Sequence, residues 1–200
     1  MQPVTLLSLA YLPPVAWFQK INEIDCVYIE KQEHYVKQSY RNRCHVLGTN
    51  GVLSLSIPVV AIHDKQPISD VKISYDEKWQ QQHWRSIESA YRNTPYFIYY
   101  VDTLKPFYQK KYEFLFDYNI ELIQWLMKNF KLSTEIKYTE TYDALTSPND
   151  YRNSIHPKKE IEEASFKTYL QLFNEKYPFK ANLSAIDLLF NAGPNSIDYL

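Results

Sequence analysis

The cations Lys37, Arg41 and Arg43 lie within seven residues of a chain whose formal net charge is only −1. On an extended strand these side chains and Ser39 would point to one side and Asn42 to the other, because side chains alternate along a strand. Arginine binds a phosphate or carboxylate through two parallel hydrogen bonds, and lysine adds a point charge. The run therefore predicts a binding site for an anionic group of a small molecule.

A simpler interpretation of these cations stays open. Glu30 and Glu33 precede the run by a few residues, and ion pairs with them would give a solvated strand face that binds no ligand. Exposed ion pairs contribute little to stability, so their presence demands no further role. The spacing alone does not separate the two interpretations.

The turn that follows the first apolar segment is a second candidate for ligand binding. Residues 4–11 are predicted to form a buried strand, and Pro13 and Pro14 stop it shortly after Tyr11. In open α/β sheets, ligands bind in the crevice beyond the carboxyl ends of the strands. We therefore expect Tyr11 to contact the ligand. The alternative is that the prolines only end the strand.

Two histidines are candidate general acids or bases, because the unperturbed pKa of imidazole lies near neutrality. His83 lies on the apolar face of a helix predicted over 77–93, so the alternative is a core histidine whose hydrogen bonds are satisfied. His156 lies in a long polar loop with Arg152 and Lys158, which can meet an anionic ligand. The alternative there is a capped, solvated loop.

Asp187 is a further acidic candidate, but its position three residues after Ser184 favours a capping box. In that motif each side chain bonds the backbone N–H of the other residue at the start of a helix. We therefore expect a structural role for Asp187 at the start of a helix over 185–191.

The overall composition argues against several classes of function. With 22 basic and 23 acidic residues, the chain has no charge excess that would attract nucleic acid or a membrane surface. No segment approaches the ~18 consecutive apolar residues of a membrane span. The three glycines form no phosphate-binding loop, and the sequence assigns no cofactor.

Cys26 and Cys44 are typical of a cytoplasmic protein with reduced, buried thiols. No Cys/His cluster has the spacing of metal ligands, so no metal site is predicted. The sequence gives no indication of the oligomeric state.

The apolar pattern predicts one α/β domain over 1–200, with a mixed sheet, an N-terminal βαβ unit, a β-hairpin and a helical C-terminal half. The sheet part covers about 1–75 and 134–138, and the helical part about 76–130 and 158–200. Strands are expected over 4–11, 26–30, 38–47, 52–59, 68–75 and 134–138, with Asn50-Gly51 in the hairpin turn. Helices are expected over 15–24, 77–93, 106–130, 158–175 and 185–191. Asp76 is expected to cap the helix over 77–93, and a break is expected near Asp117.

Seven motifs run almost from one end of the chain to the other. They are Ala10-Tyr11-Leu12-Pro13-Pro14-Val15, Lys37-Gln38-Ser39-Tyr40-Arg41-Asn42-Arg43, Leu55-Ser56-Ile57-Pro58-Val59, Trp79-x-x-x-His83-Trp84, Ala90-Tyr91-x-x-x-Pro95-Tyr96-Phe97, Ile155-His156-Pro157-Lys158 and the segment 182–194. Their order and spacing resemble those of the WbqC-like protein family of bacteria. The family's usual opening, Gln-Pro-x-Tyr-x-Pro-Trp-x-Gly-Tyr, is kept here only at Tyr11 and Pro13, and Ser8 and Leu9 stand near its Gln and Pro.

The resemblance implies a transferase of surface-polysaccharide biosynthesis, since some family members are described as transferases, including of glycine. Its donor would bear a phosphate or an acyl or aminoacyl group, and the cationic run would hold the phosphate. We expect His156 or Lys158 to close over the donor and His83 to act as the general base. The alternatives are a non-catalytic ligand-binding or regulatory module, which an exposed aromatic patch over 96–100 would favour, and a purely structural subunit.

Overall fold

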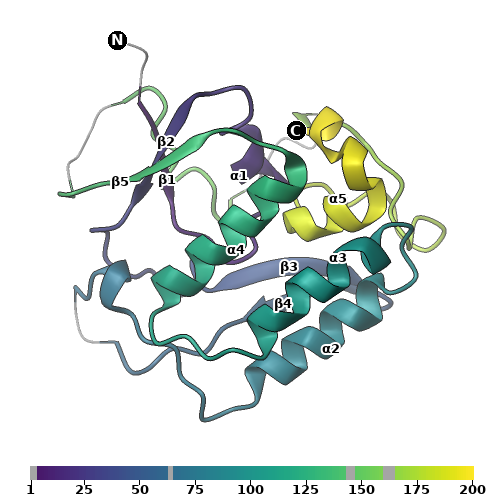
Figure 1. The fold of residues 1–200 in the computed structure, drawn as a ribbon, viewed down its shortest axis with the longest axis horizontal. Coiled ribbons are helices and arrows are strands. Elements are labelled where there is room, and N and C mark those ends of the chain that lie inside the picture. The colour runs from purple at the N-terminus through teal and green to yellow at the C-terminus, as the bar shows by residue number, and fades with distance from the viewer. Residues whose placement is uncertain (1–3, 63–64, 143–146, 160–164) are drawn as a thin grey trace.

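The computed structural model describes residues 4–62, 65–142, 147–159 and 165–200 (Figure 1). Three strands, β1 (Thr5–Ser8), β2 (Cys26–Glu30) and β5 (Glu135–Tyr138), form a parallel sheet in the order β1-β2-β5. Helix α1 (Val15–Gln19) lies between β1 and β2 in the chain. This arrangement confirms the mixed α/β class, the N-terminal βαβ unit and the parallel strand expected over 134–138.

Strands β3 (Arg43–Gly48) and β4 (Gly51–Ser56) form an antiparallel hairpin that is a separate two-stranded sheet. The hairpin closes through the pair Gly48 and Gly51. Gly51 has a φ of 103°, which explains why glycine follows Asn50 in the turn.

The strand expected over 38–47 begins only at Arg43, which corrects the geometry assumed for the cationic run. Residues 37–42 lie in turns, and Gln38 has a φ of 58°. Side chains therefore do not alternate from Lys37 to Arg43. The strand expected over 68–75 is also wrong, since Ile68–Asp70 is a 3-10 helix and the rest forms only isolated bridges.

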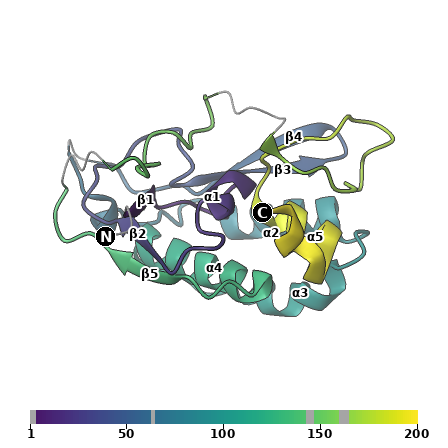
Figure 2. The ribbon, with the colours of Figure 1, turned by 90° about the horizontal axis from the view of Figure 1, so that it is seen from above.

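The helices gather on one side of the hairpin (Figures 1 and 2). They are α2 (Trp79–Tyr91), α3 (Phe97–Leu104), α4 (Leu115–Phe130) and α5 (Ala185–Ala192), with 3-10 helices at Lys105–Tyr108 and Gly193–Tyr199. The seam expected on α4 is buried at Phe116, Ile120, Ile123, Met127 and Phe130. Tyr118, Leu122 and Leu126 are buried as well, so α4 is a core helix that has apolar neighbours on most sides.

Several expected helix boundaries are wrong. Helix α1 ends at Gln19 rather than residue 24, and α2 begins after Lys78 without a capping side chain, so Asp76 does not cap it. The helix expected over 106–130 is interrupted at 109–114 and not near Asp117. No α-helix is present in the described part of the segment 158–175, which comprises 158–159 and 165–175.

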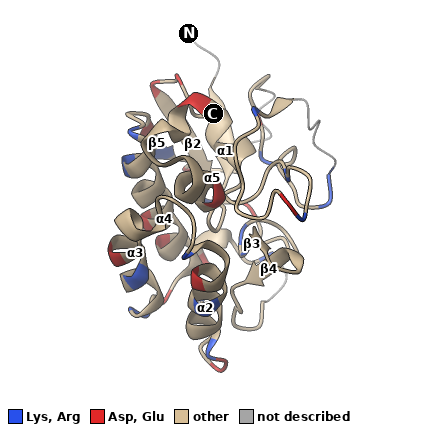
Figure 3. Cartoon of the chain, turned by 90° about the vertical axis from the view of Figure 1, so that its right-hand side faces the viewer, with Lys and Arg blue, Asp and Glu red and all other residues tan. Residues whose placement is uncertain are grey.

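Basic and acidic residues are nearly equal in number, 22 against 23. On the face shown in Figure 3, acidic and basic segments are interspersed over the helices. In the ranges that the structure describes, no helix combines the length and the apolar character that crossing a bilayer requires.

Candidate functional site

The carboxyl ends of the parallel strands bring polar residues together at one edge of the sheet. Ser8 ends β1 and Glu30 ends β2, and the register pairs these two residues. The segment 149–151 runs along the other side of β1, where the Leu6 N–H donates to the Asn149 carbonyl at 3.0 Å. This pairing carries Arg152 to the same edge as Ser8 and Glu30.

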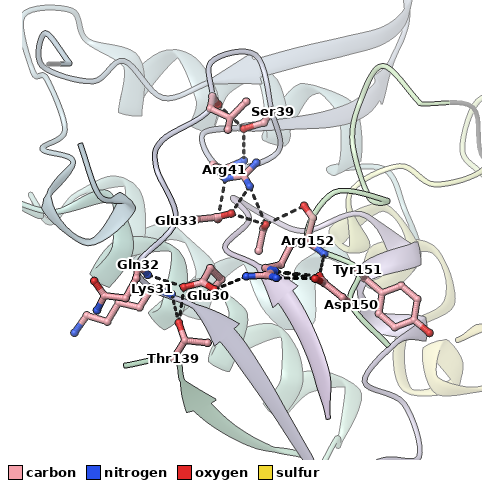
Figure 4. A network of polar contacts seen from close by, with 12 residues as sticks. Glu30, Lys31, Gln32, Glu33, Ser39, Arg41, Thr139, Asp150, Tyr151 and Arg152 are labelled. Atoms are coloured by element: carbon pink, nitrogen blue, oxygen red, sulfur yellow. Dashed lines mark hydrogen bonds and ion pairs between the residues drawn. The ribbon is translucent and has the colours of Figure 1, made fainter. Parts of the chain in front are cut away.

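Arg41, Glu33 and Ser8 form the first half of a charged network at this edge. Figure 4 shows Arg41 and Glu33 pointing toward each other. The Arg41 Nε donates to Glu33 Oε1 at 2.8 Å, and its Nη2 donates to Glu33 Oε2. The same Nη2 donates to Ser8 Oγ at 2.8 Å, and Ser8 Oγ donates to Glu33 Oε2 at 2.9 Å. Arg41 and Glu33 are each only 5% exposed. Burial raises the pKa of Glu33, although Arg41 and Ser8 oppose the rise.

Arg152, Glu30 and Asp150 form the second half of the network (Figure 4). The Arg152 Nη1 donates to Glu30 Oε2 at 2.8 Å, and its Nη2 donates to Asp150 Oδ2 at 2.7 Å. The Thr139 hydroxyl, just beyond β5, also donates to Glu30. Glu30 is fully buried, so the hydrogen bonds from these donors must replace those that its carboxylate would make with water.

Two N–H groups of the Arg41 guanidinium have no hydrogen-bond acceptor within the described ranges. Its Nη1 makes no hydrogen bond to any residue within the described ranges, whereas Nε and Nη2 are both used. Arg41 lines a small cavity together with Ser8, Tyr40, Tyr151 and Ile155. The cavity has a volume of about 10 Å³, which is room for about one water molecule.

His156 lies within electrostatic range of Arg41 at this edge. Partial burial lowers the pKa of His156, and Arg41 and Lys158 lower it further. His156 Nδ1 accepts a hydrogen bond from the Lys158 backbone N–H at 3.1 Å. The loop therefore brings Arg152 to Ser8 and His156 within electrostatic range of Arg41, while Lys158 is exposed.

The other members of the cationic run are divided between the hairpin and solvent. The Arg43 Nε donates to Ser56 Oγ at 3.0 Å, and the Asn42 Nδ2 donates to the Ile57 carbonyl at 2.8 Å. Lys37 lies in an exposed turn. The structure thus places Arg41 in the network at the sheet edge and Asn42 and Arg43 at the base of the hairpin.

Tyr35 lies close to two of these cations. Burial raises the pKa of Tyr35, and the charges of Arg43 and Arg41 oppose that rise.

Tyr11 and His83 belong to a different, buried hydrogen-bond cluster. The Tyr11 hydroxyl lies 2.9 Å from His83 Nδ1 and 2.9 Å from the Tyr108 hydroxyl. The Trp79 ring packs edge-on against His83. Burial lowers the pKa of His83 to about 4, so the imidazole is neutral at pH 7. This geometry favours the core alternative for His83, and its catalytic role stays a prediction.

Asp187 does not form the expected capping box. Its side chain is buried and accepts hydrogen bonds from the Tyr169 hydroxyl at 2.7 Å and from the Gln171 amide at 2.9 Å. The Ser184 hydroxyl has no hydrogen-bond partner within the described ranges. Burial raises the pKa of Asp187 to about 6. Asp187 therefore anchors the extended segment before α5 rather than capping the helix.

Sequence reasoning missed Ser8 and Asp150, and it considered Glu30 and Glu33 only as partners of exposed cations. The signal for Ser8 and Glu30 was their position as the last residues of two parallel strands, since such residues meet at one edge of the sheet. In the described residues, no group of three or more His, Cys, Asp or Glu side chains is placed to hold a metal ion.

The fold and this edge define an α/β protein whose parallel sheet ends in a buried network of arginines and carboxylates. The sequence profile of the WbqC-like protein family matches residues 10–163, and the chain belongs to that family. It is also similar to "Uncharacterized protein Rv1507c" of Mycobacterium tuberculosis, with 24% identity over 230 aligned positions that cover 100% of this chain and 98% of that protein. No solved structure matches the chain.

Proposed function

We propose that this chain is a transferase of bacterial surface-polysaccharide biosynthesis, and that its donor binds at the carboxyl edge of the parallel sheet. The donor bears a phosphate, or an acyl or aminoacyl group next to one. The observation that carries the proposal is the buried Arg41, whose Nη1 keeps two unpaired N–H groups within the described structure, beside a small cavity.

Fold stability gives little reason for the network. Removing two opposite charges from water costs several kcal/mol per ion, and apolar residues of similar volume often stabilise a protein equally well or better. Arg41, Glu33, Arg152 and Glu30 are all buried at this one edge. The carboxyl edge of a parallel sheet is also where open α/β folds bind their ligands.

The network restricts how a donor can bind. The cavity beside Arg41 holds about one water molecule, so a donor places a single oxygen there and the rest of it lies over the surface. Arg41 Nη1 donates to that oxygen. His156, which lies within electrostatic range of Arg41, is the nearest candidate proton donor. Arg152 positions the loop through Glu30 rather than contacting the donor.

Ligand-dependent thermal shifts test the proposal. The full chain is heated with nucleotides, sugar nucleotides, acyl-coenzyme A and aminoacyl analogues, each tested singly. A ligand at ~100 times its Kd stabilises the folded state by about 2.7 kcal/mol. We expect Arg41→Lys to abolish the thermal shift, because lysine keeps the positive charge but lacks the paired N–H donors of the guanidinium group. Arg92→Lys, at an exposed position after α2, is the matched control and should keep the shift.

The absence of any shift with the whole panel in the unmodified chain would overturn the proposal. A shift that persists in Arg41→Lys would place the anion elsewhere. In either case the network would be a structural ion-pair cluster.

A non-catalytic binding module is the second candidate, and one observation favours it. Ile98 and Tyr99 on α3 are 72% and 73% exposed, as expected for a surface that contacts a partner. Phe97 is buried, however, so the aromatic patch is smaller than the sequence indicated. Product formation by mass spectrometry with any ligand that gives a shift separates the two functions. In the same assay, His83→Gln should keep binding and lose turnover if His83 is the base.

A further inference from the structure

We propose that Ser8 is the nucleophile of this site and carries the transferred acyl or aminoacyl group as an ester between two half-reactions. The inference rests on the proposed transferase function and deepens it. No family motif points to Ser8, which stands near the position of the family's Gln.

The Ser8 hydroxyl lies between a carboxylate and a guanidinium. Its Oγ is 2.9 Å from Glu33 Oε2 and 2.8 Å from Arg41 Nη2. A serine is activated when a base within hydrogen-bond reach takes its proton. Arg41 stabilises the negative charge that develops on Oγ as the proton leaves, because its buried guanidinium already donates a hydrogen bond to Oγ.

A donor can reach the Ser8 hydroxyl through the cavity that Ser8 lines. Ser8 is the last residue of β1, it is only half-buried, and it lines the same cavity as Arg41. The cavity admits about one small group, such as the carbonyl oxygen of a donor. That oxygen lies where Arg41 Nη1 can donate to it.

Glu33 is the group that can accept the Ser8 proton. The Ser8 hydroxyl also lies 3.0 Å from the backbone carbonyl of Arg152, but an amide oxygen is too weak a base to take the proton. Burial raises the pKa of Glu33 and nearby Glu30 raises it too, while Arg41 and Ser8 lower it. A raised pKa makes a carboxylate a better base near neutral pH.

The proposed reaction has two balanced steps. In the first, Ser8 Oγ attacks the carbonyl carbon of an ester or thioester donor, the bond to the leaving oxygen or sulfur breaks, and the Ser8 proton passes through Glu33 to the leaving group. In the second, an amine or hydroxyl of the acceptor attacks the Ser8 ester. The acceptor proton passes through Glu33 back to Ser8 Oγ, and the product leaves with the acyl group. No oxidant or reductant takes part.

The test uses an alkyl fluorophosphonate, which bonds to an activated serine oxygen and releases fluoride. The full chain is incubated with this probe, and the adduct is located by peptide mass spectrometry. We expect an adduct on Ser8 that is absent in Ser8→Ala and retained in Ser154→Ala, an exposed serine of the neighbouring loop. Glu33→Gln should slow labelling by about 100-fold, as expected when a general base is lost.

A second measurement needs no variant, so a folding defect in Glu33→Gln cannot obscure the result. In the unmodified chain, the labelling rate should rise with pH as Glu33 loses its proton and then level off. Arg41, Glu30 and Arg152 are charged groups facing this pair, and the arginines stay charged throughout. His156 lies within electrostatic range of Arg41, so the same pH profile is measured in His156→Gln, where the plateau should persist. A rate that is independent of pH, or that rises without a plateau, would overturn the role of Glu33 as the base.

The outcomes separate this inference from the proposed function. No adduct on Ser8, in a chain that still gives an Arg41-dependent thermal shift, would overturn the nucleophile and leave the transferase proposal intact. The absence of both the adduct and the shift would overturn both. An adduct that forms equally fast in Glu33→Gln would show ordinary surface reactivity and would also overturn the inference.

Discussion

Replacing Asp187 by asparagine should change how the stability of this protein depends on pH. Asp187 is buried, and it accepts hydrogen bonds from the Tyr169 hydroxyl and the Gln171 amide through the same oxygen, Oδ2. Asparagine has nearly the same shape, and its carbonyl oxygen can accept both bonds. The substitution therefore removes the ionisable group with little change in packing.

The magnitude follows from the pKa of the carboxyl group. Burial raises the pKa of Asp187 from its ordinary 3.8 to about 6, although Tyr169 and Gln171 oppose the rise. At 1.36 kcal/mol per pKa unit, this difference corresponds to about 3 kcal/mol. The folded state binds the proton more tightly than the unfolded state. The contribution of Asp187 is therefore fully present below pH ~4 and is lost as the pH rises through about 6.

Urea unfolding of both proteins, followed by tryptophan fluorescence at several pH values, measures the effect. We expect the unfolding free energy of Asp187→Asn, minus that of the unmodified chain, to increase by about 2.4 kcal/mol between pH 4 and pH 7. His83 contributes the opposite slope, since burial lowers its pKa to about 4 and its stabilisation is lost as the pH falls below its ordinary 6.5. Because His83 is present in both proteins, its contribution cancels in the difference.

Asp198→Asn, at an exposed position near the C-terminal end, is the control and should give a difference that stays flat with pH. If the difference for Asp187→Asn also stayed within about 0.5 kcal/mol over this range, the carboxyl group would titrate as an exposed one does. Burial would then not control the pKa of Asp187.

Two further predictions concern packing. Gly193 has a φ of 56° and a Cβ there would overlap the Tyr96 ring, so Gly193→Ala should lower the unfolding free energy by about 3 kcal/mol. The control is Gly48→Ala, where the atom nearest to a new Cβ is 3.8 Å away, and it should change the unfolding free energy by less than about 1 kcal/mol. Equal effects of the two substitutions in urea unfolding would contradict the close contact at Gly193. Native protein treated with a thiol-specific chromogenic disulfide should react at the half-buried Cys26 and not at the buried Cys44, where burial also raises the pKa of the thiol. Reaction of both thiols at the same rate before unfolding would refute the burial of Cys44.

Local sequence signals predicted those elements that depend on nearby residues. The strand over 26–30, the Asn50-Gly51 turn and the buried seam of α4 were all predicted correctly. Each depends on side-chain alternation, turn chemistry or helical spacing within one segment. The sequence alone also indicated the family, because the resemblance depends on the order of short motifs along the chain.

Local signals failed where distant residues decide the conformation. Val71 and Ile73 alternate as in a strand, but the backbone around them makes isolated bridges to 59 and 114 and pairs with no full strand. The segment 165–175 has apolar residues at helical spacing, yet Leu170 is 70% exposed and Gln171 is held by bonds to Lys180 and Asp187. Such contacts override helix propensity, which is weak for each residue.

The sequence by itself determined the α/β class, the family and the presence of unusual cations near residue 41. Only the tertiary structure decided what those cations contact, because Ser8 and Arg152 are 144 positions apart and meet through strand pairing. The same folding buries Arg41 against Glu33 and leaves Arg43 at the hairpin. The energy of a charge depends on its partners and on its exposure to water, and neither is a property of local sequence.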